Sequence, residues 1–166
     1  MRDLYAIALV GLVFASAYAF WLLPDFLCRF LVVLATRTVY KMRVTHADRV
    51  PHEGPALIIA NHVSYADGFL IGSATSRFVH FLIAEEYYEK PLIKRFGKWA
   101  GLVSVPDSGG PKALRATMDK VKDLLRAGEV VCIFPEGRLT GNGAIGEFKR
   151  GFLKMIPEDV DVPIIP

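Results

Sequence analysis

The chain has 166 residues, of which 52% are hydrophobic and 22% are charged, and its formal net charge is +3. This length fits one domain with a hydrophobic core of its own. A small positive charge without a helix-turn-helix, RNA-binding or zinc-knuckle pattern gives no support to nucleic-acid binding, so we expect no nucleic-acid partner. Clustered Lys and Arg, with a pI near 8.9, favour an anionic partner such as a membrane surface.

The first predicted element is an apolar segment over residues 4–23, which carries no charge and is long enough to cross the hydrocarbon core of a bilayer. A secretory signal peptide is the alternative, because residues 15–17 (Ala-Ser-Ala) resemble a cleavage site. The apolar run continues beyond that point, however, and Arg2 is followed at once by Asp3. These two features favour a retained membrane anchor.

A second, more mixed apolar segment over residues 26–40 follows Pro24, which we expect to end the first helix. The positive-inside rule places the rest of the chain in the cytoplasm, because basic residues crowd the carboxyl side of the anchor. A hairpin of two helices that enters one leaflet is the alternative. In both cases residues 1–43 are expected to anchor an α/β domain at residues 44–166. The basic residues are Arg37, Lys41, Arg43 and Arg49.

Short apolar runs alternate with helical patterns through the rest of the chain. Because strands that alternate with helices indicate an α/β fold, we expect a mixed sheet flanked by helices. The predicted strands are residues 56–60, 78–83, 101–105, 130–134 and 161–166, and the predicted helices start near residue 67 or cover residues 91–100 and 112–127.

Polar residues follow the first of these strands. Asn61 and His62 come directly after it, and Asp67 stands five residues beyond the histidine. Open α/β folds usually build their sites at the carboxyl ends of strands. A carboxylate at this spacing can accept a hydrogen bond from one imidazole nitrogen and leave the other basic. The spacing alone is weak, since Asp67 could instead cap a helix and His80 with Glu85 repeats the spacing inside a strand.

A second polar block, residues 134–138 (Phe-Pro-Glu-Gly-Arg), follows the strand at 130–134, so two strand ends can bring the two loops together. These blocks, with Val-Pro-Ile-Ile-Pro at 162–166, resemble the glycerolipid acyltransferase family, which includes the 1-acylglycerol-3-phosphate acyltransferases. The resemblance covers about residues 45–166, with the blocks in the same order. Family members usually continue beyond the last block, so we expect a chain truncated at its carboxyl end.

The residues favour direct acyl transfer, because the chain has no Gly-x-Ser-x-Gly sequence. Its cysteines, Cys28 and Cys132, lie in apolar segments without metal-ligand spacing, so we expect neither metal nor cofactor. We expect His62 to be the general base that deprotonates an acceptor hydroxyl, which then attacks an acyl thioester. Asp67 would hold the imidazole tautomer, and Asn61 is a candidate for stabilising the oxyanion.

The resemblance also implies a site for the phosphate end of the acceptor, formed by Glu136, Gly137, Arg138 and Lys149. The arginine of this block comes one residue earlier than in the family's commoner Glu-Gly-Thr-Arg-Ser sequence. In addition, Asp107 stands where family members that act on small glycerol phosphates often have an arginine.

The expected function is that of a membrane-bound O-acyltransferase of phospholipid synthesis, with acyl-CoA or acyl carrier protein as donor and lysophosphatidic acid as acceptor. Asp107, and a likeness of both blocks to bacterial lysophospholipid-recycling enzymes in which the domain is fused to an acyl-activating ligase, keep open a lysolipid with a head group, such as lysophosphatidylethanolamine. A hydrolase and a non-catalytic lipid-binding module are further alternatives. We expect the protein at a membrane, the bacterial inner membrane, with its catalytic domain in the cytoplasm.

Overall fold

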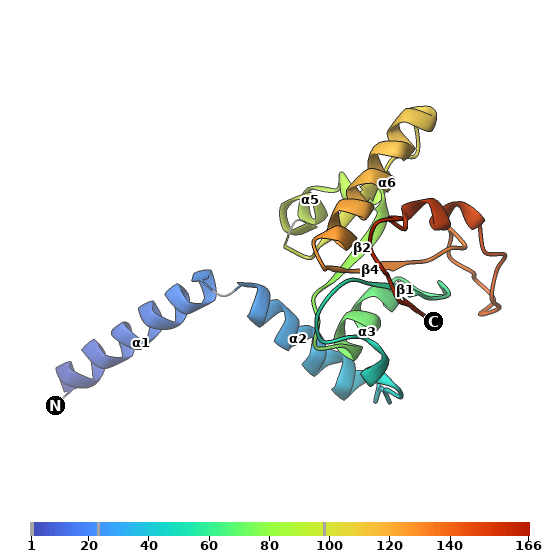
Figure 1. Cartoon of the computed structure of the whole chain (residues 1–166). Helices are drawn as coiled ribbons and strands as arrows, with labels where there is room; N and C mark the ends of the chain where they lie inside the picture. Colours follow the sequence, from blue (N-terminus) through green and yellow to red (C-terminus); the bar gives the residue numbers. More distant parts are fainter. Residues whose placement is uncertain (1, 23, 98) are drawn as a thin grey trace. The chain divides into compact units, whose positions relative to one another are not determined.

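Two helices form the amino-terminal unit of the computed structural model, which describes residues 2–22, 24–97 and 99–166. The chain divides into the units Met1–Lys41 and Met42–Pro166. In the first unit, α1 (Arg2–Leu22) is followed by α2 (Pro24–Val39) (Figure 1). Proline cannot continue a helix but is favoured in a first helical turn, because its missing N–H has no partner there in any case. The second helix therefore starts where Pro24 is predicted to end the first.

The described side chains along α1 are exposed, and the large apolar ones range from 54% exposure at Val10 to 71% at Tyr5 and Phe14. Within the described part of the chain, no helix combines the length and the apolar character that crossing a membrane requires. The transmembrane helix expected from residues 4–23 is therefore not confirmed.

Five strands form one sheet in the second unit, in the order β3-β2-β4-β1-β5. Every pairing is parallel, so the prediction of a mixed sheet is wrong. Parallel neighbours need crossover connections, and here segments with helices or 3₁₀ turns, rather than hairpins, join successive strands. The strands are β1 (Ala56–Ile59), β2 (Val79–Ala84), β3 (Leu102–Val105), β4 (Val130–Ile133) and β5 (Ile164–Ile165).

Helices connect these strands, and all of them except α4 lie close to the positions that the sequence predicts. They are α3 (Asp67–Ala74), α4 (Glu85–Tyr88), α5 (Pro91–Gly97) and α6 (Gly110–Arg126). A short 3₁₀ segment, η1 (Ala47–Arg49), precedes β1, and a second, η2 (Arg150–Met155), lies between β4 and β5. The predictions missed α4, a single turn that directly follows β2.

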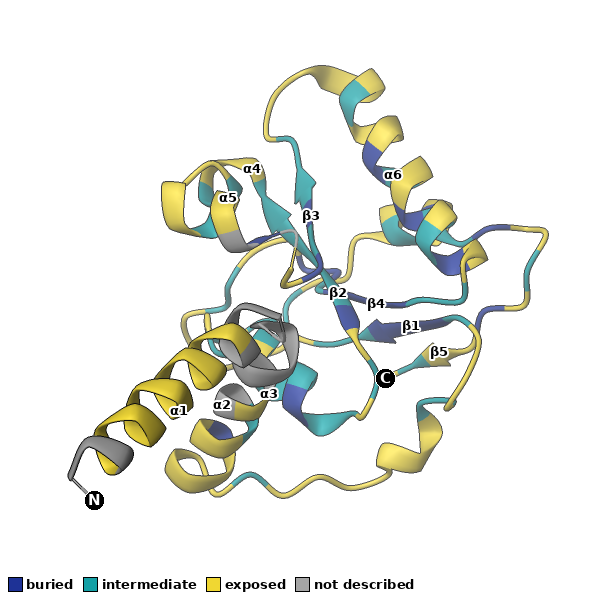
Figure 2. Ribbon diagram, turned by 90° about the vertical axis from the view of Figure 1, so that its left-hand side faces the viewer, coloured by how far each residue is buried: buried dark blue, intermediate teal, exposed yellow. Residues whose placement is uncertain are grey.

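The core lies on both faces of the sheet, with alternate residues of β1 and β4 facing opposite sides. Leu57 and Val131 pack with Leu125 of α6, whereas Ile58 and Cys132 belong to a second cluster, against which Ile71 of α3 packs. Figure 2 shows the buried central strands with α3 and α6 beside them. Burying a side chain such as Leu57 contributes about 2 kcal/mol. Because β1 and β4 are covered on both faces, they read as continuous apolar runs.

Arg77 forms hydrogen bonds that link the segments preceding three of the strands. Its guanidinium donates hydrogen bonds to the carbonyl oxygens of Pro51 and Gly54, both at 2.9 Å, and of Gly128 at 2.7 Å. Gly54 precedes β1, Gly128 precedes β4 and Arg77 itself precedes β2. These bonds help to fix the amino ends of the strands, whose carboxyl ends carry the polar loops.

Candidate active site

The loops after β1 and β4 lie side by side, because the two strands are parallel neighbours with Ala56 opposite Val130. Pairing extends past the strand ends, where the N–H of Ala60 donates to the carbonyl oxygen of Ile133 at 3.2 Å. Further on, Thr140 donates its N–H to the carbonyl oxygen of His62 at 2.8 Å. The two polar blocks of the sequence therefore meet at the carboxyl ends of β1 and β4.

His62 and Asp67 form the expected pair. Nδ1 of His62 lies 2.9 Å from Oδ2 of Asp67, and the same oxygen accepts the N–H groups of Val63 at 2.8 Å and Ser64 at 2.9 Å. Asp67 is the first residue of α3, and its side chain turns back into the loop, so it does not cap its own helix. The side chains are only 23% exposed for His62 and 16% for Asp67.

The surroundings of Asp67 keep it ionised. Burial alone would raise the pKa of this carboxyl, but the hydrogen bonds from Ser64, the His62 ring and Val63, with the charge of the imidazole when protonated, lower the pKa below its ordinary value. An ionised carboxylate only accepts hydrogen bonds, so Nδ1 of His62 carries the proton and Nε2 keeps its lone pair. No residue in the described ranges forms a hydrogen bond with Nε2. His62 is thus set up as a base.

The ring of His62 has a second support in Phe134, which directly follows β4. The two rings are stacked, with centroids 4.0 Å apart and an angle of 14° between their planes. The carboxylate at the ring edge and the phenyl group against its face together fix the direction of the imidazole. The sequence places Phe134 in the second block but gives no sign of this contact.

The backbone of His62 is also held from the loop after β4. Its N–H donates to Oε1 of Glu136 at 3.0 Å, and its carbonyl oxygen accepts both the N–H of Thr140 at 2.8 Å and the Thr140 hydroxyl at 3.0 Å. Glu136 is only 2% exposed, and its other oxygen, Oε2, is buried with no hydrogen-bond partner in the described part of the chain. Thr140 is not among the predicted site residues, although it stands only two residues beyond the second block.

Lys149 lies against the second block, beside Gly137. Its N–H donates to the carbonyl oxygen of Pro135 at 3.0 Å. Gly137 has a φ of +65°, and a Cβ at that position would lie only 2.9 Å from Nζ of Lys149. Glycine therefore suits both the backbone and the close ammonium group. Arg138 and Asn61 are exposed in the two neighbouring loops.

Asp107 lies at the carboxyl end of another strand than His62 does. It follows β3, which is separated from β1 by β2 and β4 and is therefore about 14 Å away at the usual strand spacing. Its carboxylate accepts the N–H of Glu86, in the first turn of α4, at a long 3.4 Å.

Cys132 is not equipped to form an acyl-enzyme. The residue is fully buried in β4, and burial, with a smaller contribution from the charge of Asp67, raises the pKa of its thiol to about 12. A thiol that stays protonated at neutral pH is a poor nucleophile. The side chain of Cys28 lies outside the described residues.

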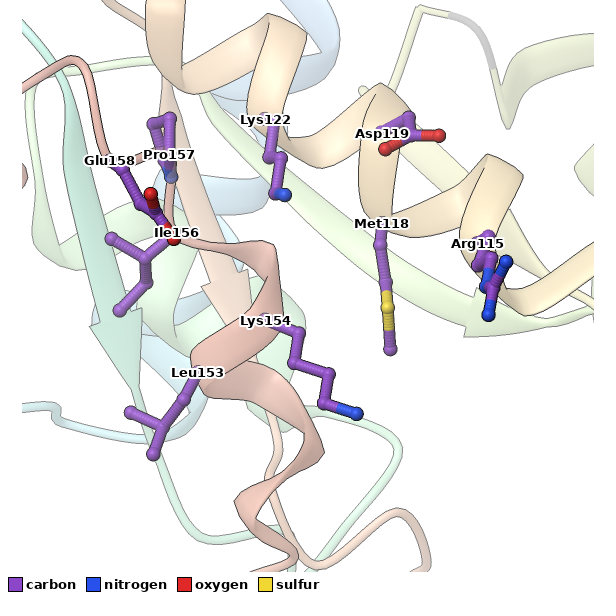
Figure 3. A pocket seen from close by; sticks show the side chains of 9 residues that line it. All are labelled: Arg115, Met118, Asp119, Lys122, Leu153, Lys154, Ile156, Pro157 and Glu158. Carbon is purple, nitrogen blue, oxygen red and sulfur yellow. The ribbon is translucent and has the colours of Figure 1, made fainter. Parts of the chain in front are cut away.

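A groove of about 700 Å³ lies between α6 and η2 (Figure 3). Its lining mixes apolar side chains with charges of both signs and includes none of the predicted site residues. The lining residues are Arg115, Met118, Asp119, Lys122, Leu153, Lys154, Ile156, Pro157 and Glu158.

Known proteins resemble this chain over most of its length. Residues 41–166 match the family described as Acyltransferase. The chain is 28% identical over 131 residues to the "Probable 1-acyl-sn-glycerol-3-phosphate acyltransferase" of Mycoplasma pneumoniae, a match covering 76% of this chain and 48% of that protein. It is 26% identical over 113 residues to the chloroplastic 1-acyl-sn-glycerol-3-phosphate acyltransferase LPAT1 of Arabidopsis thaliana, covering 68% of this chain and 31% of that protein. The chain thus spans less than half the length of these curated relatives.

The fold has a counterpart among solved structures. The crystal structure of the 1-acyl-sn-glycerophosphate acyltransferase PlsC from Thermotoga maritima superposes with a TM-score of 0.62 at 17% identity. The match covers 99% of this chain and 83% of that one. At this identity the likeness concerns the fold alone.

Proposed function

This chain belongs to the Acyltransferase family, and we propose that it moves a fatty acyl group from an acyl thioester to the free hydroxyl of a lysophospholipid. The observation that carries the proposal is the 2.9 Å contact between Nδ1 of His62 and Oδ2 of Asp67, which leaves Nε2 as a base. General-base catalysis by a positioned histidine accelerates such a reaction by about 10²–10⁴-fold.

In the proposed reaction, Nε2 of His62 takes the proton from the acceptor hydroxyl as its oxygen attacks the thioester carbonyl carbon. A new C–O bond forms, and the carbonyl electrons move onto the oxygen. Collapse of this tetrahedral intermediate breaks the C–S bond, and the departing thiolate receives the proton from the imidazolium. Asp67 stabilises the imidazolium and holds its orientation throughout. The products are the diacyl lipid and the free thiol of coenzyme A or acyl carrier protein.

We take lysophosphatidic acid as the first acceptor, because the two curated relatives named above are 1-acyl-sn-glycerol-3-phosphate acyltransferases. Lys149 and Arg138 are exposed cations on the loop next to His62, and they are our candidates for binding the phosphate. Gly137 leaves room for the Lys149 ammonium. Asn61 remains a candidate for stabilising the oxyanion of the tetrahedral intermediate.

A lysolipid with a head group, such as lysophosphatidylethanolamine, is the second candidate acceptor. The observation that favours it is Asp107, an exposed carboxylate at a position where the sequence resemblance suggests an arginine. Asp107 follows β3, about 14 Å from β1, so it would meet only an acceptor that extends from His62 toward β3. There its carboxylate would repel a phosphomonoester dianion more strongly than a zwitterionic head group.

We further propose that residues 1–43 attach the protein to a membrane, with the α/β domain on the cytoplasmic side. The exposed apolar side chains of α1 and the basic residues that follow α2 support this attachment. Washing isolated membranes with carbonate or high salt tests it. The full-length protein should stay in the pellet, and release into the supernatant would contradict the proposal.

The activity is tested with detergent-purified protein and labelled acyl-CoA or acyl carrier protein, with lysophosphatidic acid, lysophosphatidylethanolamine or no acceptor. We expect labelled diacyl lipid that depends on the acceptor. Free fatty acid as the main product would indicate hydrolysis, and no turnover with any donor would favour a non-catalytic lipid-binding module. A covalent acyl-protein during turnover would contradict direct transfer.

A further inference from the structure

The loop after β4 holds the peptide groups on both sides of the candidate general base. Glu136 accepts the hydrogen bond of the His62 N–H, and Thr140 donates two hydrogen bonds to the His62 carbonyl oxygen. These partners are 74 and 78 residues away in sequence. Fixing the backbone on both sides fixes the Cα–Cβ direction and hence where Nε2 can reach.

Glu136 does not have the exposure expected of a substrate ligand. It is 2% exposed, and its Oε2 is buried and has no hydrogen-bond partner among the residues that the structure describes. Gly146 covers this oxygen closely, because a Cβ on Gly146 would lie 2.7 Å from Oε2 and 3.3 Å from Cγ2 of Thr140. A buried carboxylate oxygen without a partner is costly and calls for an explanation. The hydrogen bond that Oε1 accepts from the backbone N–H of His62 supplies one.

We propose that Glu136 and Thr140 are positioning residues that hold His62 in register for proton transfer, and that Gly146 keeps the Glu136 carboxylate in place by having no side chain. This inference rests on the proposed acyl transfer. It gives Glu136 a role through His62 in place of contact with the phosphate of the acceptor. Misplacing a base by about 1 Å costs on the order of 10²-fold in rate, so the effect should appear in kcat.

The first experiment compares Glu136→Ala with Glu136→Gln in the full chain. Glutamine keeps a carbonyl oxygen for the His62 N–H, whereas alanine removes the acceptor. We expect Glu136→Ala to lower kcat by about 50-fold with the KM for lysophosphatidic acid within about threefold, and Glu136→Gln to keep at least about a third of kcat. A loss carried by the acceptor KM, or a glutamine variant as inactive as the alanine variant, would overturn the proposal.

Gly146 allows the carboxylate to be displaced without being removed. The backbone of Gly146 is not in the left-handed region, so alanine can adopt it, and the three atoms nearest to the new methyl group belong to Glu136 and Thr140. Gly146→Ala should lower kcat by about tenfold or more. Gly141→Ala is the matched control, because Gly141 lies in the same loop with no atom within 4 Å of the added Cβ.

A double-mutant cycle tests whether Gly146 acts through Glu136. If Gly146→Ala acts through the Glu136 carboxylate, it should add less than about twofold to the kcat loss of Glu136→Ala, since the displaced group is already absent. Multiplying effects in the double variant would refute the link between the two residues.

Thr140 is tested by a pair of variants that differ in the hydroxyl. Thr140→Ser keeps the hydroxyl and the N–H, and Thr140→Val keeps the shape and the N–H but loses the hydroxyl. We expect serine to retain kcat within about twofold and valine to lose about five- to tenfold. Equal activity of the two variants would remove Thr140 from the proposal.

An amide hydrogen-exchange measurement separates this inference from the proposed function. The His62 N–H is protected by Glu136, so its exchange should speed up by about tenfold or more in Glu136→Ala and stay near the native rate in Glu136→Gln. This result does not require turnover. If the unmodified protein fails to transfer acyl groups, the proposed function is wrong, whereas unchanged His62 exchange in a folded Glu136→Ala protein refutes the positioning contact.

Discussion

Two histidines in this chain are each followed by an acidic residue five positions later, yet they have different partners in the structure. His62 leaves β1 in a loop, and that loop turns back so that Asp67 lies 2.9 Å from its Nδ1. His80 lies within β2 and Glu85 begins α4 beyond the end of that strand. A strand rises about 3.3 Å per residue, so five positions carry the acid about 16 Å away. Instead, Nε2 of His80 lies 3.7 Å from Oε2 of Glu129.

A histidine and an acid five residues apart therefore form a pair only where the backbone between them turns back, as it does after β1. Two N–H groups of the first loop bind the same Asp67 oxygen as the imidazole, so the turn itself gathers around the carboxylate. The ring of His80 instead lies edge-on to the Phe78 ring, with centroids 5.1 Å apart, and its Nε2 faces the half-exposed carboxylate of Glu129. The predictions below test this difference.

The largest difference is expected between the two histidines themselves. His62→Ala removes the base and should lower kcat by about 10³-fold, whereas His80→Gln should leave kcat within about threefold. Steady-state transfer assays on both variants measure this, with thermal unfolding to show that each is folded. Near-normal turnover by His62→Ala would rule out the mechanism.

The two acids should differ next. An asparagine at position 67 can turn its amide NH₂ toward Nδ1 and favour the wrong imidazole tautomer, so Asp67→Asn should cost about 10²-fold in kcat. Glu85→Gln, at the exposed start of α4, should change kcat by less than about twofold. Equal losses in the two variants would show that the spacing, and not the loop, carries the effect.

The cations near the first pair should have a smaller effect, on binding of the acceptor. Removing the ammonium of Lys149 or the guanidinium of Arg138 should raise the KM for lysophosphatidic acid by about tenfold, with little change for lysophosphatidylethanolamine. Lys120→Ala, on the exposed side of α6, serves as the control. Unchanged KM values for lysophosphatidic acid in both variants would remove these residues from the phosphate site.

The smallest effect concerns stability against pH. Since folding lowers the pKa of Asp67, its charged form stabilises the fold fully above the unfolded pKa, and this contribution is lost as the pH falls through the lower folded pKa. Asp67→Asn should therefore reduce the free energy of unfolding by about 1 kcal/mol at neutral pH, and the gap should narrow below about pH 4. Urea unfolding at several pH values measures it, and a constant gap would contradict the ionised state of Asp67.

Much of this fold follows from patterns that are local in the sequence. The apolar runs that become β1 and β4 and the helical spacing of α6 are visible in the sequence, and so is the pair of His62 and Asp67. Strand order is different, because a run that is buried on both faces does not reveal its neighbours. Strand direction was missed as well, since a mixed sheet is predicted where every pairing is parallel.

The supporting part of the site depends on that strand order. Glu136 and Thr140 reach the backbone of His62 only because β4 lies next to β1, and Gly146 reaches Glu136 only through the path of a long loop. A glutamate in a polar block looks the same in sequence whether it faces substrate or a backbone N–H. Its burial, with 2% exposure, and the 3.0 Å hydrogen bond from the His62 N–H to Oε1 distinguish the two roles for Glu136.

The burial of Cys132 has a consequence for measuring motion in this protein. Its thiol lies in the strand that ends at the second polar block, and it combines no exposure with a pKa of about 12. An alkylating reagent can reach it only when β4 opens, so the rate of its modification reports how often the strand behind the active site comes apart. Mapping the labelled peptide distinguishes this signal from Cys28. The protein thus carries a native reporter of opening in its central strand, without any engineered label.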